Sequence, residues 1–337
     1  MSERLALAVD GGNSKTDLAL VHANGEVLAV RRGPQSSPHH LGVDGSLDVL
    51  GRLLDEACQE AGIGRNGTPV AEIAQLQLAG VDFPSEEEEV RQAVDRRGWV
   101  ERAVVGNDTF AVLRAGTERG WGVAVVCGAG INCVGVAPDG RHARFPALGP
   151  ITGDWGGGHD VGVAALFAAA RSEDGRGPKT TLEQAVPAHF GLASPGELAE
   201  AIHRGRIPMQ RIVELAPVVL AEAGHDPAAA EIVDRLASEI VALARVALSR
   251  LGLEGKAVEV LLGGGLLQSA DGRLIEKIEA SMREVGPSIS VHTTASAPVV
   301  GAGLLALDTL GASPEAQARL RQELGEAVRG LTGSRDG

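Results

Sequence analysis

Short apolar runs separated by polar turns dominate the first thirty residues and predict three consecutive strands. Residues 5–9 and 18–21 are runs of small and branched apolar side chains. Asn24-Gly25 is a strong β-hairpin signal, so a third strand is expected over residues 26–30. The first turn leads into a strand and not into a helix, which excludes both a Walker A loop and a dinucleotide-binding fingerprint.

The turn between the first two strands is rich in groups that suit a phosphate chain. Asp10 ends the first strand, and Gly11-Gly12 lets the backbone approach a ligand because neither residue has a Cβ. Further donors come from the backbone and side chains of Asn13, Ser14, Lys15 and Thr16. The Asp10 carboxylate suits a hydrated Mg²⁺ that bridges phosphate oxygens. The alternative for this stretch alone is an ordinary hairpin with an acidic residue at its end.

Helical and strand spacings then alternate as far as residue 115. Helices are expected over residues 46–62, 85–97 and 108–115, and strands over residues 72–79 and 100–105. The intervening turn-rich segment before the first helix is either a plain surface loop or a loop that reaches toward a polar substrate.

Three of these predicted strands are followed by polar residues. Asp10 ends the first strand, Asp82 follows the strand 72–79, and Asn107-Asp108 follows the strand 100–105. In open α/β sheets, ligands gather at the carboxyl ends of strands, so these side chains are candidates for one site. Asp108 also has a simpler interpretation, as the N-cap of the next helix.

A second strand–glycine turn–strand unit begins at Trp121. Strands are expected over residues 121–127 and 133–136, and the turn between them is Gly128-Ala129-Gly130-Ile131-Asn132. The plan repeats that of the N-terminus without matching it residue by residue. The repeat predicts two related domains whose glycine turns face a shared cleft. A third glycine turn, Gly263-Gly264-Gly265, lies between a predicted strand and a helix.

The stretch 148–160 combines glycines with an acidic and an aromatic side chain. Gly156-Gly157-Gly158 precedes an apolar helix and lets backbone N–H groups approach a ligand. Asp154 can accept hydrogen bonds from sugar hydroxyls, and Trp155 packs either on a ring or in the core. The segment 171–255 is mostly helical and indicates core packing.

The C-terminal part of the chain predicts close helix packing. A strand is expected over residues 289–292, and a helix begins near Pro298. Gly301-Ala302-Gly303 in this helix permits close approach of a neighbour. The tail 314–329 has one apolar face and is expected to fold back on a domain.

Composition and charge indicate the number of domains and argue against some classes of partner. The chain has 337 residues, which suggests two domains, and 44% are hydrophobic while 2% are aromatic. A net charge of −13 argues against nucleic acid or an anionic membrane as a partner. Cys58, Cys127 and Cys133 form no paired pattern and are expected to be buried thiols. No signal peptide or membrane-spanning run is visible, so a cytoplasmic location is expected.

Taken together, the three glycine turns resemble those of the sugar-kinase branch of the actin-like ATPase superfamily. The sequence most resembles the N-acetylglucosamine kinase-type family, also called the BadF/BadG/BcrA/BcrD ATPase family, over residues 5–310. The resemblance implies an α/β, two-domain actin-like (ribonuclease H-like) fold with a nucleotide and sugar cleft between the domains. The expected domains are residues 1–118 and 119–312, and residues 313–337 are a C-terminal helix and tail packed back on the first domain.

The resemblance also implies ATP-dependent phosphorylation of a sugar hydroxyl. Asp108 is the implied general base, and Asp10 is the implied holder of Mg²⁺ through water. The implied ATP-binding residues are Gly11, Gly12, Asn13, Ser14, Lys15, Thr16, Gly128, Ala129, Gly130, Gly263, Gly264 and Gly265. The implied sugar-binding residues are Ser37, Asp82, Asn107, Asp108, Ile131, Asn132, Gly149 and Asp154.

Departures from the family pattern leave the identity of the sugar open. Gln35-Ser36-Ser37-Pro38 stands where relatives often carry an Asn, and Asp154-Trp155-Gly156-Gly157 replaces the usual Asp-Glu-Gly-Ser. The leading hypothesis is a kinase that phosphorylates the 6-hydroxyl of N-acetylglucosamine or glucosamine, and the expected partners are that sugar and a second copy of the chain.

Two alternatives remain open beside this hypothesis. One is an ATPase activator or conformational switch of the same family, although Cys127 and Cys133 do not lie in the pattern that holds the iron–sulfur cluster of such activators. The other is a sugar sensor without catalysis, which an intact Asp108 and first glycine turn disfavour.

Overall fold

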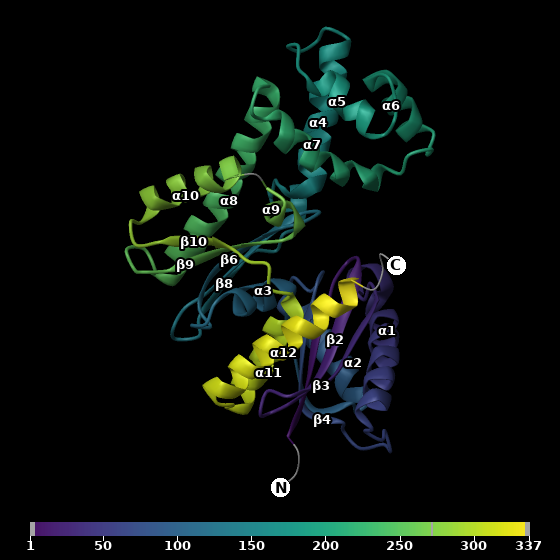
Figure 1. Cartoon of the computed structure of the whole chain (residues 1–337), viewed down its shortest axis with the longest axis vertical. Coiled ribbons are helices and arrows are strands. Elements are labelled where there is room, and N and C mark those ends of the chain that lie inside the picture. Colours follow the sequence, from purple (N-terminus) through teal and green to yellow (C-terminus); the bar gives the residue numbers. More distant parts are fainter. Residues whose placement is uncertain (1–3, 271, 334–337) are drawn as a thin grey trace. The chain divides into compact units, whose positions relative to one another are not determined.

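Two five-stranded sheets organise the chain, one in each of two α/β units (Figure 1). The computed structural model describes residues 4–270 and 272–333. Unit 1 is built from the residues up to Gly120 together with those from Ala295 onward. Unit 2 is the intervening segment Trp121–Thr294.

The sheet of unit 1 has the strand order β3-β2-β1-β4-β5. β1, β2 and β3 are antiparallel neighbours, whereas β4 pairs in parallel with β1 and β5 with β4. The strands are β1 Leu5–Gly11, β2 Lys15–His22, β3 Val27–Pro34, β4 Ala71–Leu78 and β5 Val100–Asn107. The three strands predicted for the first thirty residues are therefore confirmed.

Alternating residues along these strands fill two separate cores. Leu7 and Val9 of β1 belong to the core that is shared with α1 and α2. Ala6 and Ala8 belong to the core that is shared with α3, α11 and α12. These helices are α1 Pro38–Ala61, α2 Pro84–Arg97, α3 Asp108–Gly116, α11 Pro298–Leu310 and α12 Pro314–Gly333. The alanines on the second face leave room for helices to approach the sheet closely.

The return of α11 to unit 1 corrects the predicted domain boundary. The sequence assigned residues 119–312 to one domain, but the residues from Ala295 onward belong to unit 1. The reason is the apolar face of α11, where Val299 and Leu304 are fully buried in the core that contains Ala6 and Ala8. Figure 1 shows α11 and α12 in yellow beside this sheet.

The start of α1 also differs from the prediction. The helix begins at Pro38 and not at residue 46, so most of the predicted loop is taken up by β3 and the first turn of α1. Gly42 interrupts the helix with φ 68°, a left-handed conformation that glycine adopts without strain. Ser46, the first residue of the predicted helix, is fully buried inside α1 and donates from Oγ to the carbonyl oxygen of Ser36 at 2.6 Å.

The sheet of unit 2 repeats the plan of the first. Its strand order is β8-β7-β6-β9-β10, with β6, β7 and β8 antiparallel and β9 and β10 added in parallel. The strands are β6 Gly122–Cys127, β7 Ile131–Val136, β8 His142–Arg144, β9 Glu259–Gly263 and β10 Ser290–Thr293. The two sheets share one topology, which confirms the internal repeat predicted from the glycine turns.

Helices make up most of the rest of unit 2, as the sequence predicted. The α-helices are α4 Gly157–Glu173, α5 Leu182–His189, α6 Pro195–His203, α7 Ala216–Glu222, α8 Pro227–Leu251, α9 Gly265–Gln268 and α10 Gly272–Val285. Cys58 in unit 1 and Cys127 and Cys133 in unit 2 are free and buried, as expected. Among the described helices of the whole chain, none is long and apolar enough to cross a bilayer.

Candidate active site

A row of polar residues crosses the sheet of unit 1 at the carboxyl end of β1. In the strand register, Arg32 on β3 lies opposite Asp17 on β2, and Asp17 lies opposite Asp10 on β1. Asp10 in turn lies beside Gln77 on β4, and Gln77 lies beside Gly106 on β5. Because directly opposed residues of neighbouring strands share a face, these side chains stand together on the face that α3 and α11 cover. We call Arg32, Asp17, Asp10 and Gln77 the polar row.

Asp17 anchors one end of the polar row through an ion-paired cluster. Arg32 donates from Nε to Oδ1 of Asp17 at 2.6 Å and from Nη2 to Oδ2 at 2.9 Å. Lys15 Nζ donates to Oδ2 at 2.9 Å. The side chain of Asp17 is 0% exposed and that of Arg32 9%, whereas that of Lys15 is 47% exposed. The bidentate contact with Arg32 fixes the Asp17 carboxylate. Asp17 in turn holds the Lys15 ammonium at the glycine turn, within reach of solvent.

The carboxyl group of Asp10 lies in a position where its charge is disfavoured. Burial and, to a smaller extent, the nearby carboxylates of Asp108 and Asp17 raise the pKa of Asp10 to about 8, against the opposing effect of Lys15 and Arg32. A divalent cation beside Asp10 would reverse this balance because it stabilises the ionised carboxylate. The carboxyl groups around Asp10 therefore suit a divalent cation at the carboxyl end of β1.

Asn107 caps α3 and ties its start to the neighbouring strand end. Asn107 Oδ1 accepts hydrogen bonds from the backbone N–H of Thr109 at 3.0 Å and from its hydroxyl at 2.7 Å. Asn107 Nδ2 donates to Asp82 Oδ1 at 2.8 Å. The capping residue is thus Asn107, so the interpretation of Asp108 as the N-cap is wrong. The structure brings Asp82, Asn107 and Asp108 together, as the predicted strand ends required.

Asp108 is the first residue of α3 and is half-buried. Burial raises the pKa of its carboxyl group to about 6, and the backbone N–H groups of Thr109 and Asp108 itself partly oppose this shift. The group is therefore mostly ionised at neutral pH, yet its affinity for a proton is well above that of an exposed aspartate. These are the properties that a general base needs near pH 7.

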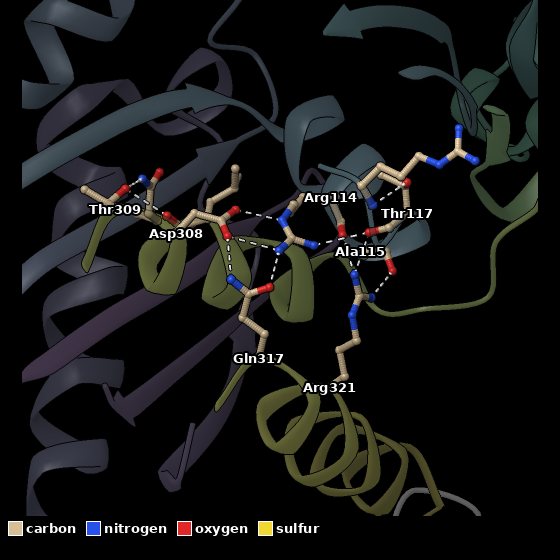
Figure 2. A network of polar contacts seen from close by, with 10 residues as sticks. Arg114, Ala115, Thr117, Asp308, Thr309, Gln317 and Arg321 are labelled. Atoms are coloured by element: carbon tan, nitrogen blue, oxygen red, sulfur yellow. Dashed lines mark hydrogen bonds and ion pairs between the residues drawn. The ribbon is translucent and has the colours of Figure 1, made fainter. Parts of the chain in front are cut away.

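Polar contacts at the other end of α3 hold the helix in place. Arg114, near this end, is 4% exposed, and it donates from Nε and Nη2 to Asp308 of α11 at 2.7 and 3.0 Å. Arg321 of α12 donates to the carbonyl oxygens of Ala115 and Thr117, each at 2.6 Å. Figure 2 shows how these contacts join α3, α11 and α12. The helix that begins at Asp108 is thus fixed at both ends.

The glycine turn of unit 1 needs its glycines for packing as well as for access. A Cβ on Gly11 would lie 2.4 Å from Leu78 Cδ2 and 2.7 Å from Ser36 Oγ. Asn13 and Ser14, at the tip of the turn, are exposed. Thr16 is buried, and its hydroxyl contacts Ser36 Oγ at 2.7 Å. The tip residues are therefore the part of the turn that is open to a ligand.

Ser37, a predicted sugar contact, lies beneath the surface of unit 1. The residue is 0% exposed, and its hydroxyl donates to the backbone carbonyl of Ala79 at 2.8 Å. This bond ties the start of α1 to the turn after β4. The placement gives Ser37 a structural role in joining these two segments.

The glycine segments of unit 2 converge on one another. Gly158 N donates to Gly128 O at 2.8 Å, so the start of α4 rests on the turn between β6 and β7. A Cβ on Gly157, which has φ 80°, would lie 2.5 Å from backbone atoms of Gly130. A Cβ on Gly264, which has φ 91°, would lie 2.4 Å from the carbonyl oxygen of Cys127. Only glycine fits at both positions, because the backbone segments touch.

The segment after β8 is held by its own polar contacts. Asp154 N donates to Gly149 O at 3.0 Å, and the hydroxyl of Thr152 contacts the Asp154 carboxylate. Asn132 Oδ1 accepts from the backbone N–H of Cys133 at 2.7 Å. Ile131 is 7% exposed and belongs to the core of unit 2. Asp154 and Asn132 are partly accessible, whereas the Ile131 side chain serves packing.

Sequence reasoning missed three members of the polar row: Asp17, Arg32 and Gln77. Asp17 and Arg32 carried a usable signal, since counting outward from the two hairpin turns places Asp17 opposite Asp10 and Arg32 opposite Asp17. Gln77 lies on a strand that pairs in parallel, and no local turn sets that register.

Side chains of the described residues provide few direct ligands for a metal ion. Within residues 4–270 and 272–333, no three or more His, Cys, Asp or Glu side chains are grouped so that they could hold a metal ion. Asp10 is therefore considered as a group that acts on a hydrated cation, which keeps water as most of its ligands.

Comparison with known proteins gives a consistent assignment. The family model "BadF/BadG/BcrA/BcrD ATPase family" matches residues 7–306. N-acetylmuramic acid/N-acetylglucosamine kinase of Clostridium acetobutylicum is 28% identical over 270 residues, which cover 79% of this chain and 86% of that protein. N-acetyl-D-glucosamine kinase of Dictyostelium discoideum is 26% identical over 328 residues, which cover 92% of this chain and 99% of that protein.

A solved structure supports the same fold. The crystal structure of a candidate N-acetylglucosamine kinase from Chromobacterium violaceum matches with a TM-score of 0.71 and 26% identity. The match covers 91% of this chain and 100% of that one. The α/β, two-domain actin-like fold expected from the sequence is therefore confirmed.

Proposed function

Because the chain belongs to the BadF/BadG/BcrA/BcrD ATPase family, we propose that it is an ATP-dependent amino-sugar kinase. In this proposal it transfers the γ-phosphate of ATP to the 6-hydroxyl of N-acetylglucosamine or glucosamine. The names of the two curated relatives support this substrate class. The observation that carries the proposal is the half-buried Asp108 carboxyl group, which α3 presents next to the Asn107–Asp82 pair with a pKa of about 6.

Unit 1 supplies the base and the electrostatic setting of the reaction. Asp108 accepts the proton of the attacking sugar hydroxyl, while the Asn107–Asp82 pair fixes the start of α3 so that the base keeps its position. Lys15, held by Asp17 at the glycine turn, places a positive charge where phosphate oxygens arrive. Mg²⁺, held by Asp10 through its water ligands, supplies charge neutralisation on the phosphate chain when it is bound.

The backbone and side chains of the glycine turns are the proposed nucleotide contacts. In unit 1 these are the residues from Gly11 to Thr16, of which Asn13 and Ser14 are the most open. In unit 2 they are Gly128-Ala129-Gly130, on which the start of α4 rests, and Gly263-Gly264-Gly265, of which Gly264 lies against Cys127 at the end of β6. Asn132, Gly149 and Asp154 are the proposed sugar contacts from unit 2.

The test is a measurement of ADP release with Mg²⁺ and ATP across a panel of sugars. The panel contains glucose, glucosamine, N-acetylglucosamine, N-acetylmannosamine, N-acetylmuramic acid and no sugar. We expect release that depends on an amino sugar and that falls at least a hundredfold in Asp108→Asn, because general bases contribute about 10²–10⁴-fold. The matched control is Asp44→Asn, which changes a carboxylate that is 94% exposed on α1.

Two results would argue against the proposal. Equal ADP release with and without every sugar would favour an ATPase switch. A full-rate Asp108→Asn variant would remove Asp108 from the role of base.

A further inference from the structure

Gln77 carries a buried acceptor atom that no protein group satisfies. The residue is 3% exposed, and its Oε1 is a buried side-chain oxygen without a hydrogen-bond partner within the described part of the chain. Buried polar atoms are paired in the great majority of cases, because an unpaired acceptor loses its hydration without compensation. An unpaired oxygen in the polar row therefore calls for a donor from outside the chain, either an ordered water molecule or a group that arrives with a ligand.

A chain of hydrogen bonds fixes which end of the Gln77 amide is the acceptor. The hydroxyl of Thr309 on α11 donates to the carbonyl of Leu305 at 2.8 Å, so it can only accept from Gln75 Nε2, at 3.3 Å. Gln75 Oε1 then accepts from Gln77 Nε2 at 3.0 Å. Each bond sets the orientation of the next amide, and the carbonyl end of Gln77 is left over.

The surroundings of this oxygen place it next to the proposed cation. Gln77 lies beside Asp10 in the parallel register of β1 and β4. On its other side is Gly106, where a Cβ would lie 3.1 Å from Gln77 Oε1. The glycine therefore leaves space beside the acceptor that a larger residue would fill.

A water molecule on a divalent cation matches this acceptor. Its oxygen is bound to the metal, so its protons point outward and need acceptors. Asp10 provides carboxylate acceptors on one side, and Gln77 provides a neutral carbonyl on the other. A neutral acceptor adds no further negative charge to a row that already holds two carboxyl groups.

We propose that Gln77 is a positioning residue, whose side-chain carbonyl accepts a hydrogen bond from a water ligand of the Mg²⁺ held by Asp10. The inference rests on the proposed function, since it assumes that a metal–nucleotide complex binds at the polar row. In this proposal the buried glutamines of β4, Gln75 and Gln77, orient the cation and do not serve to hold the sheet together.

The test measures metal binding without turnover. Mn²⁺ is the probe, in the presence of a non-hydrolysable ATP analogue and without sugar, and free Mn²⁺ is followed by electron paramagnetic resonance. We expect Gln77→Met to raise the dissociation constant of Mn²⁺ by about tenfold or more, as is common for residues that hold metal ligands. The melting temperature of the metal-free variant should change little, because the substitution removes one unsatisfied acceptor, Gln77 Oε1, but also removes the donor to Gln75 Oε1.

Two further variants separate positioning from folding. Gly106→Ala keeps the acceptor but narrows the space beside it, and it should also weaken Mn²⁺ binding. Gln317→Met removes a glutamine of α12 that is bonded to Arg114 and Asp308, and it should lower the melting temperature while leaving Mn²⁺ binding unchanged.

The outcomes distinguish this inference from the proposed function. Wild-type Mn²⁺ affinity in Gln77→Met, with a lowered melting temperature, would overturn the positioning role alone. A wild-type protein that binds no Mn²⁺ with the analogue would overturn both the positioning role and the proposed metal-dependent function.

Discussion

Replacement of Gly301 by alanine is expected to separate α3 from α11 and so to move Asp108. A Cβ at position 301 would lie 1.9 Å from the carbonyl oxygen of Ala111 and 2.9 Å from the backbone nitrogen of Ala115. Both neighbours are backbone atoms of α3, so no side chain can rotate away. Ordinary contact begins near 3.4 Å, so the two helices must separate locally by about 1.5 Å.

Two effects of this separation can be estimated. Overpacking of this kind typically costs about 1–3 kcal/mol of stability, and the Arg114–Asp308 bonds between the same helices are strained in addition (Figure 2). A displacement of about 1 Å at a catalytic group can lower the rate by about 10²-fold. We therefore expect a lowered melting temperature together with a kcat reduced between tenfold and a hundredfold.

Gly303→Ala is the matched control, two residues further along the same helix. Its Cβ would meet Leu320 Cδ2 at 2.9 Å, which is the end of a side chain that can adjust. The variant should lose less than about 1 kcal/mol, since alanine also favours a helix over glycine by about that amount. Thermal unfolding and steady-state kinetics of both variants are the measurements. Equal melting temperatures and equal kcat values for the two variants would refute the claim that this close contact positions Asp108.

Two more predictions concern the charges of unit 1. With saturating Mg²⁺ and ATP, log kcat should fall by one unit per pH unit below about pH 6. The reason is that the pKa of Asp108 is raised to about 6 and that only its ionised form accepts a proton. A kcat profile that stays level down to pH 5 would contradict this role. Arg32→Met should destabilise the protein by about 3 kcal/mol or more in urea unfolding, because it leaves the fully buried Asp17 without its bidentate partner. Lys15→Met, which changes the 47% exposed partner of the same carboxylate, should cost less than about 1 kcal/mol while weakening nucleotide binding, and similar losses for the two variants would count against this division of roles.

Local signals were enough to predict the strands of both sheets apart from β8, together with their glycine turns. The Gly11-Gly12 turn and the Asn24-Gly25 hairpin can each be recognised from a few consecutive residues, and so can the turn at Gly128-Ala129-Gly130. Asp108 was also accessible, because a polar residue directly after a buried strand points to the carboxyl edge of a parallel sheet. These features depend on the order of residues along one short segment.

Contacts between distant segments could not be predicted in the same way. Gln77 joins the polar row through the parallel pairing of β1 with β4, and the intervening α1 leaves no countable turn between them. The assignment of α11 to unit 1 depends on a fit between Gly301 and the backbone of α3, which lies almost two hundred residues earlier. The amphipathic pattern of such a helix indicates that one face is covered, but it does not indicate which sheet covers that face.

The discontinuity of unit 1 has a consequence for the order in which the chain acquires its structure during synthesis. The five strands of its sheet are complete once Asn107 has left the ribosome, but only α3 can pack on the face that carries Ala6 and Ala8 until α11 and α12 have been made. Unit 2 is continuous and can bury its own core in the meantime. A nascent chain that stops between Thr294 and Pro298 would therefore carry one finished unit and one open apolar sheet face, which is the kind of surface that chaperones retain.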